Sequence, residues 1–146
     1  MTEKQKKLEF FNRKARFDYQ IIESFEVGIV LLGSEIKALR AGKVNLTGSY
    51  ARILGNELWW VGGEIRTEGA DPTHSRKLLV HHEQLNRLAG LTKEKGLTLL
   101  PLKIYLKKGR AKMELGVGRG LKKYDKREIE KKRDQEREAA GRIKQR

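Results

Sequence analysis

Cysteine is absent from this chain, which excludes both disulfide bonds and metal sites built from thiolates. No apolar run is long enough to cross a bilayer, and no apolar segment follows the charged residues 1–7 as a secretory signal requires. Catalytic motifs are missing too: no glycine-rich phosphate loop precedes a predicted helix, and no serine, histidine and aspartate set has a workable spacing. We therefore expect a cytoplasmic protein that is not an enzyme and that uses no metal, cofactor, membrane or small-molecule substrate.

Acidic residues are few compared with basic ones. The 146 residues include 33 lysines and arginines against 19 acidic residues, and the formal net charge is +14. Such an excess on a chain with room for one modest domain and a tail indicates a polyanionic partner. Nucleic acid is the first candidate, because neutralising its phosphates supplies much of the affinity. An anionic membrane is the second, but no basic segment carries a convincing apolar face.

Alternating apolar residues predict one unusually long strand. The residues that share one parity are Phe17, Tyr19, Ile21, Phe25, Val27, Ile29 and Leu31. Glu23 interrupts this pattern and Gly28 lies within it, so we expect a bend or bulge that curls the strand around a barrel. Glu26 falls on the outward parity, either as a solvated carboxylate or as an acceptor for an RNA base or ribose.

Residues 33–43 predict a short helix between two strands. Ser34 is suited to the N-cap, Glu35 to the first turn, and Gly42 to a left-handed end. Ile36 and Leu39 share one face, which would plug an end of a barrel, and the cations on the other faces are Lys37, Arg40 and Lys43. The alternative is an ordinary connecting helix whose lysines are solvated.

Two hairpins and one further helix follow. Gly55-Asn56 predicts a turn between strands at 49–54 and 58–61, and the second strand carries two adjacent tryptophans. One tryptophan belongs in the core; the other either packs at the rim, which we favour, or stacks on a base. Leu85, Leu88 and Ala89 predict a helix over 83–91, for which Gly90 is a candidate end, and residues 92–96 are suited to one further helical turn.

Residues 100–117 give the clearest hairpin, with a turn at Lys108-Gly109. Pro101 indicates that its first strand starts at an edge or a bulge. We interpret residues 116–120 as a flexible strand exit, and residues 44–48 and 65–72 as loops. His81 and His82 are adjacent, but neighbouring positions rarely converge on one metal ion.

Residues 119–146 contain twelve lysines and arginines, six acidic residues, no proline and few large apolar side chains. Such a segment cannot bury enough surface to offset its ordering entropy. The pairs Glu128/Lys132 and Glu138/Arg142 nevertheless have the spacing that supports a helix. We expect a tail that is disordered alone and helical on a polyanion; the alternative is a permanently solvated tail.

These residues, taken together, resemble one known family over nearly the whole chain from Asn12. The matching motifs are Asn12-Arg13-Lys14-Ala15-Arg16, Tyr19, Phe25-Glu26, Gly28, residues 33–43, Ser49-Tyr50-Ala51, Asp71-Pro72, Arg76-Lys77-Leu78-Leu79, Gly96-Leu97-Thr98, Pro101-Leu102 and Tyr124-Asp125-Lys126-Arg127. In order and spacing they resemble the small protein B family, the SsrA-binding proteins of bacteria. The segment between Ile65 and Asp71 is shorter than we expect for that family, and residues 73–75 are less basic.

The resemblance implies a mainly β fold: an antiparallel barrel of the oligonucleotide-binding type with about three short helices. It implies an RNA-binding barrel over residues 12–120, and with it we expect a charged flexible leader over residues 1–11 and a basic tail over 121–146. It also implies binding without catalysis. Members bind the tRNA-like domain of transfer-messenger RNA (tmRNA) near its elbow and deliver it, with elongation factor Tu, to stalled ribosomes, where the tail enters the empty mRNA path.

By this resemblance, residues on or beside the RNA-facing surface are Asn12, Arg13, Lys14, Glu26, Lys37, Arg76, Lys77 and Leu78, to which we add the neighbouring cations Arg16, Arg40 and Lys43. Residues of the ribosome-directed tail are Tyr124, Asp125, Lys126 and Arg127 at its root, and Lys131, Lys132, Arg133 and Ile143 beyond it. The basic cluster at 12–16 has a second interpretation, as a solvated entry to the first strand.

Two other functions fit the composition. A structural ribosomal protein would also be a small basic barrel with a long tail. An RNA-processing enzyme would use His81 or His82 as a general base.

Overall fold

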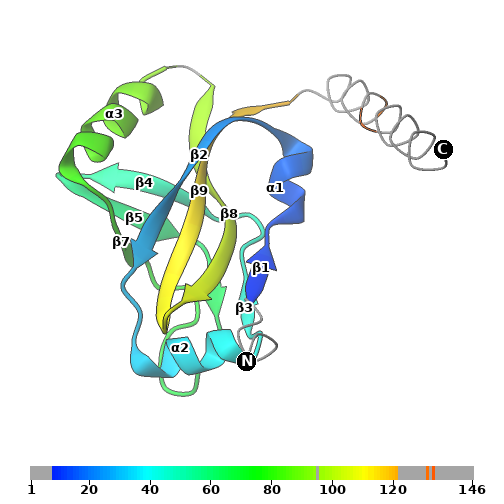
Figure 1. Ribbon diagram of the computed structural model, residues 1–146, viewed down its shortest axis with the longest axis vertical. Helices are drawn as coiled ribbons and strands as arrows, with labels where there is room; N and C mark the ends of the chain where they lie inside the picture. The colour runs from blue at the N-terminus through cyan, green and yellow to red at the C-terminus, as the bar shows by residue number, and fades with distance from the viewer. Residues whose placement is uncertain (1–7, 95, 122–130, 132, 134–146) are drawn as a thin grey trace.

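The computed structural model of the protein describes residues 8–94, 96–121, 131 and 133 (Figure 1). Nine strands and three helices are present in these ranges. In chain order they are β1 (Glu9–Phe11), α1 (Arg13–Asp18), β2 (Tyr19–Ile29), α2 (Gly33–Arg40), β3 (Val44–Asn45), β4 (Tyr50–Leu54), β5 (Glu57–Val61), β6 (Glu64–Ile65), β7 (Arg76–Leu79), α3 (His82–Thr92), β8 (Leu97–Lys107) and β9 (Arg110–Gly120).

Six of the strands close into an antiparallel barrel. Following the hydrogen-bonded neighbours gives the ring β8, β4, β5, β7, β2 and β9, which returns to β8. This confirms the predicted antiparallel barrel of the oligonucleotide-binding type. Strand β1 pairs with residues 103–105 in the C-terminal half of β8, and Glu9 lies opposite Tyr105. Residues 9–11, which the sequence analysis placed in the leader, are therefore a strand of this sheet. Strands β3 and β6 form a separate small pair inside the segments expected to be loops.

Strand β2 follows the predicted alternation of inward and outward residues, with Val27 and Ile29 in the core. Its pairing with β9 shifts register between Ile21 and Glu23, so the predicted bulge is confirmed. Phe17 does not belong to this strand. It lies in helix α1, which the sequence analysis missed.

Helices α2 and α3 cover opposite ends of the barrel (Figure 1). Leu39 of α2 and Leu88 of α3 are buried in the same core, so the predicted plugging helix is confirmed. The cap of α2 differs from the prediction: the helix begins at Gly33, one residue before Ser34, and the backbone N–H of Leu32 donates to Glu35 Oε1 at 2.9 Å. Gly42 ends the turn with φ 75°, as expected. Helix α3 continues past Gly90 to Thr92, so Gly90 does not end it, and its bounds lie within one residue of the predicted 83–91.

The first half of β8 is covered on both faces. Leu99 faces the main core, whereas Leu100 and Leu102 pack with Ala15 of α1 in a second, smaller core. A register shift between Pro101 and Lys103 confirms the bulge, one of the two predicted alternatives, but the strand begins earlier, at Leu97. Residues 116–120 are part of β9 and not a flexible exit. A Cβ on Gly116 would lie only 2.8 Å from Leu102 Cδ1, so a larger residue there would displace the buried Leu102 side chain.

Trp60 is the tryptophan that belongs to the core, and Gly63 makes room for its ring. Trp60 is fully buried, and its Nε1–H donates to Ser49 Oγ at 2.9 Å. A Cβ on Gly63 would lie 1.9 Å from Trp60 Cζ2. Gly63→Ala should therefore lower the free energy of unfolding by about 1–3 kcal/mol, the usual cost of overpacking a core. Denaturant titration measures this change.

Gly90→Ala is the matched control for Gly63→Ala. Gly90 lies in helix α3 with open space around it, so an added methyl group meets nothing within 4 Å. Alanine in a helix is favoured over glycine by up to about 1 kcal/mol, so this variant should be as stable as the wild type or more so. Equal stabilities of Gly63→Ala and the wild type would show that the ring moves aside without cost.

Candidate RNA interface

Asn12 anchors the basic cluster of the N-terminal region to the barrel. Its Oδ1 accepts from the backbone N–H of Ala15 at 3.2 Å, which makes it the N-cap of α1. Its Nδ2 donates to the carbonyl oxygens of Pro101 at 2.9 Å and Leu46 at 3.3 Å. These three bonds satisfy both polar atoms of the Asn12 side chain, which is buried and only 3% exposed. Asn12 therefore lies beneath the surface, next to the exposed cations of α1, and its side chain fixes where α1 lies.

Helix α1 presents its cations to solvent. Arg13, Lys14 and Arg16 are exposed, while Ala15 packs against the barrel. Arg16 Nη2 lies 3.8 Å from Glu114 Oε1, a half-exposed contact that holds its guanidinium only weakly. The three cations are therefore accessible to phosphate groups, and their exposure is compatible with both interpretations of this cluster, an RNA-facing patch and a solvated entry to the first strand.

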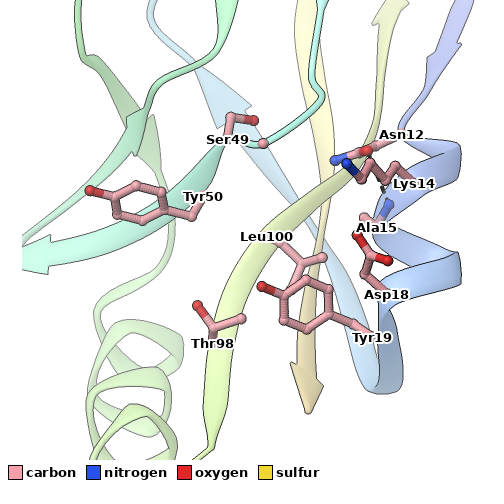
Figure 2. A pocket seen from close by; sticks show the side chains of 10 residues that line it. Asn12, Lys14, Ala15, Asp18, Tyr19, Ser49, Tyr50, Thr98 and Leu100 are labelled. Atoms are coloured by element: carbon pink, nitrogen blue, oxygen red, sulfur yellow. Dashed lines mark hydrogen bonds between the residues drawn. The ribbon is translucent and has the colours of Figure 1, made fainter. Parts of the chain in front are cut away.

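A groove of about 330 Å³ opens beside α1 (Figure 2). Residues that line it come from α1, the start of β2, the turn before β4, β4 and β8: Asn12, Lys14, Ala15, Asp18, Tyr19, Gly48, Ser49, Tyr50, Thr98 and Leu100. Figure 2 shows Tyr19 and Tyr50 on opposite sides, with Thr98 between them and Lys14 at one edge. Aromatic rings, hydroxyl groups and one ammonium are suited to bases, riboses and phosphates of a structured RNA.

A second set of cations lies on the α2 end of the barrel. Lys37, Arg40 and Lys43 are all exposed, as the sequence predicted. Lys37 and Lys43, together with Arg66, line another hollow of about 470 Å³. Figure 1 shows α1 and α2 on different parts of the barrel. The structure therefore divides the predicted basic residues between two surfaces.

Arg76 is buried, which corrects its expected position on the RNA-facing surface. Its Nε donates to Glu35 Oε2 at 2.8 Å, and its other nitrogens donate to the carbonyl oxygens of Gly63 at 3.0 Å and Pro72 at 2.8 Å. The guanidinium also lies 5.3 Å from the centroid of the Trp60 ring. Each of the three guanidinium nitrogens thus donates to the protein, and Arg76 acts as a structural tie between α2, β7 and the loop after β6.

Glu35 is the counter-charge of Arg76 and is equally buried. Burial alone would raise the pKa of this carboxyl. Hydrogen bonds from the Leu32 N–H, Arg76 and His74, with the positive charge of Arg76, outweigh burial and lower the pKa of Glu35 below its usual value. The carboxylate is therefore ionised throughout the neutral range and stabilises the fold as a charged pair.

Lys77 and Leu78, which follow Arg76, point in opposite directions. Leu78 lies in the core with 2% of its surface exposed, so its expected contact with RNA is also corrected. Lys77 points outward, and its Nζ lies 2.6 Å from Glu57 Oε2 in a half-exposed pair. Of the motif Arg76-Lys77-Leu78, only Lys77 has its charged group at the surface.

Glu26 lies on the outer face of β2, as its parity predicted. The Tyr105 hydroxyl donates to Glu26 Oε2, and Lys107 Nζ lies 3.9 Å from the same oxygen. Burial, the hydrogen bond to Glu26 and the charge of that carboxylate together raise the pKa of Tyr105 above its usual value. Tyr105 and Lys107 thus hold the Glu26 carboxylate at the barrel surface.

Tyr19, Tyr50 and Thr98 are groove residues that the site prediction missed. Tyr19 and Tyr50 belonged to the family motifs, but nothing local in the sequence places two residues 31 positions apart on one groove. Tyr50 could have been found from its position in the predicted strand, where the alternation of side chains places it on the outward face.

Among the described ranges, no group of three or more histidine, cysteine or acidic residues is arranged to hold a metal ion. Likewise, no described helix has the length and apolar content to cross a membrane. His81 and His82 are exposed at the start of α3.

Most of the predicted tail residues fall outside the residues that the structure describes. These are Tyr124, Asp125, Lys126, Arg127, Lys132 and Ile143. Lys131 and Arg133 are described, and both are exposed in helical conformation.

Comparison with known proteins gives consistent matches along the chain. Residues 10–145 match the family described as SmpB protein. The SsrA-binding protein of Chloroflexus aggregans is 52% identical over 142 residues, which cover 92% of this chain and 90% of the relative. That of Magnetococcus marinus is 50% identical over 133 residues, which cover 87% of this chain and 89% of the relative.

A solved structure described as "tmRNA-SmpB: a journey to the center of the bacterial ribosome" has the same fold, with a TM-score of 0.68 and 45% sequence identity. The superposition covers 82% of this chain and 92% of that one. The family match over residues 10–145, with relatives about half identical over most of their length, shows that this chain belongs to the SmpB family of SsrA-binding proteins.

Proposed function

We propose that this chain binds tmRNA, the SsrA RNA, and acts in trans-translation. It binds the tRNA-like domain near the elbow and, together with elongation factor Tu, delivers tmRNA to stalled cytoplasmic ribosomes, which are rescued as the nascent peptide is tagged. The observation that carries this proposal is the match of nearly the whole chain to SsrA-binding proteins at about 50% identity.

The geometry supports a protein that works by binding alone. The barrel is closed, and Asn12, the N-cap of α1, is tied to the rest of the fold by two hydrogen bonds, to the carbonyl oxygens of Leu46 and Pro101. Arg13, Lys14 and Arg16 then contact phosphates of the L-shaped RNA beside the groove of Figure 2. Recognition by shape, backbone contacts and unpaired bases is the usual way in which proteins bind structured RNA.

The second basic surface gives the barrel two sides on which to contact RNA. Lys37, Arg40 and Lys43 lie at the α2 end, whereas Glu26 and Lys77 lie on the outer faces of β2 and β7. A protein that bridges tmRNA and ribosomal RNA needs two such surfaces, because each RNA repels the other unless cations lie between them. The tail, with Tyr124, Asp125, Lys126, Arg127, Lys131, Lys132, Arg133 and Ile143, enters the empty mRNA channel and orders there.

Charge reversal at Arg13 and Lys14 should weaken binding to tmRNA and flatten its dependence on salt. Each lost phosphate contact lowers the magnitude of the slope of log K against log salt by about 0.7 to 0.9. The slope of the double variant should therefore be smaller in magnitude by roughly 1.4 to 1.8. Filter binding across a salt series, with tmRNA, ordinary tRNA and duplex RNA compared, measures both quantities.

The matched control reverses Lys108 and Arg110, two exposed cations at the β8–β9 turn. It changes the net charge by the same amount, and at about 0.15 M salt the effect of distant charges is largely screened. If the control variant loses as much of its salt dependence as the double variant Arg13→Glu/Lys14→Glu, the cations of α1 contribute no more to tmRNA binding than distant cations do. Equal affinity of the wild type for tmRNA and duplex RNA would refute the proposed function itself.

A further inference from the structure

Trp59 is an aromatic side chain on the outside of the barrel that the proposed contacts do not use. It lies in the middle of β5, between Leu58 and Trp60, which are both fully buried. Because successive side chains of a strand point to opposite faces, Trp59 points outward, where it is partly exposed. The core is filled by Trp60, so the packing of the interior does not explain why the next residue is also a tryptophan.

Two cations flank Trp59 on the neighbouring strands. Arg52 of β4 and Lys77 of β7 are its direct register partners. Directly opposed residues of antiparallel strands share a face, with their Cβ atoms about 5 Å apart. The three side chains therefore form a row across the outer face of β4, β5 and β7: a guanidinium, an indole and an ammonium.

The cations of this row are accessible. Arg52 is exposed. Lys77 is paired with Glu57, but both side chains of that pair are nearly half exposed, at 43% and 45%. An exposed ion pair is worth only about 0–1 kcal/mol, so a phosphate can replace Glu57 at little cost. Leu54 and Leu79, which share the outward parity on β4 and β7, are also about half exposed.

We propose that Trp59, with Arg52 and Lys77 beside it, is a stacking platform for one unpaired RNA base. An indole ring accepts the flat face of any base, and cations on both sides bind the phosphates that precede and follow it. The surface also continues the groove of the proposed RNA interface. Tyr50, which lines that groove, is two residues from Arg52 on the same face of β4. A cationic row next to an RNA groove favours RNA over an apolar protein partner.

This inference rests on the proposed function, because it extends the same RNA track. The platform differs from the α1 contacts in chemistry, since it binds a base through its π face and needs an unpaired nucleotide. The stacking platform can therefore fail without the proposed function failing, because the wild type can prefer tmRNA whether or not Trp59 stacks on a base.

Substitution of Trp59 in the full chain tests the platform. With a transcript of the tRNA-like domain of tmRNA as the probe, Trp59→Ala and Trp59→Leu should each lose about 5- to 100-fold in affinity, as expected for one stacked base. Trp59→Phe keeps an aromatic face and should stay within about 3-fold of the wild type. Trp59→Leu keeps an apolar side chain on the outer face of the sheet, so it distinguishes stacking on a base from a contribution of apolar packing alone.

Tryptophan fluorescence gives a second measurement that does not depend on stability. Trp60 is buried, so quenching of the wild type by the transcript should come from Trp59 and should vanish in Trp59→Phe, which still binds. Wild-type affinity in Trp59→Leu, or equal quenching in Trp59→Phe and the wild type, would overturn the platform while leaving the proposed function intact. A wild type that shows no preference for the transcript over duplex RNA would overturn both.

Discussion

Truncation after Leu121 should abolish peptide tagging on stalled ribosomes and leave the affinity for tmRNA nearly unchanged. The barrel and both basic surfaces lie within residues 8–121, and the backbone N–H of Leu121 still donates to the Asp18 carbonyl oxygen at 2.9 Å. The removed residues contain eleven lysines and arginines and six acidic residues, so the barrel keeps most of the net charge of +14. The affinity for tmRNA should therefore fall only slightly, whereas the truncated protein lacks the segment that would enter the mRNA path of the ribosome.

Two measurements separate these roles. Filter binding reports the affinity for tmRNA, and a reconstituted translation reaction on a truncated message reports tagging. The control replaces residues 122–146 with a scrambled sequence of the same composition. It restores the charge without the order of residues, so tagging should remain absent. A large loss of tmRNA affinity on truncation would place RNA binding in the tail, and tagging by the truncated chain would remove the tail from the mechanism.

The tail is also expected to discriminate between ribosomes. A segment that orders only inside an empty, RNA-lined channel binds ribosomes without a message in that channel more tightly than those with one. Co-sedimentation of the full chain, bound to tmRNA, with the two kinds of ribosome tests this. Equal binding to both would contradict the proposed ordering step.

The barrel could be predicted because its signals are local. Alternation of apolar residues identified β2 and the β8–β9 hairpin, and interruptions at Glu23 and Pro101 identified their bulges. A half-buried strand must place apolar residues at every second position, so the pattern survives whatever the neighbouring strands are. Helix α1 gave no such pattern, because its six residues bury only Ala15.

The site was predicted less well because burial of polar groups depends on distant partners. The sequence presents Arg76 and Lys77 as one basic pair, yet a carboxylate 41 residues away draws Arg76 inside. Asn12 likewise opens a basic cluster, but its acceptors are carbonyl oxygens of residues 46 and 101. Nothing adjacent in the sequence distinguishes a cation that binds RNA from one that binds the protein.

Glu35→Gln should be the most destabilising of the charge substitutions considered. It leaves the Arg76 guanidinium buried beside a neutral amide, and removing one partner of a buried ion pair costs about 3–5 kcal/mol. The midpoint of thermal unfolding should fall by roughly 10 °C or more. Glu57→Gln, which breaks the exposed pair with Lys77, is the control and should change stability by less than about 1 kcal/mol. Similar stabilities of the two variants would show that Arg76 can reach solvent.

The pH dependence of stability separates the charge of Glu35 from its shape. Hydrogen bonds and the charge of Arg76 lower the folded pKa of this carboxyl despite its burial, so it binds a proton less readily in the fold than in the unfolded chain. Its contribution is therefore complete above the unfolded pKa and is lost as pH falls through the folded pKa. As pH falls below the ordinary glutamate pKa of 4.5, the wild type should lose more stability than Glu35→Gln, which has no carboxyl to protonate. Parallel curves for the two proteins would mean that Glu35 holds Arg76 by geometry alone, and the buried pair would then owe nothing to charge.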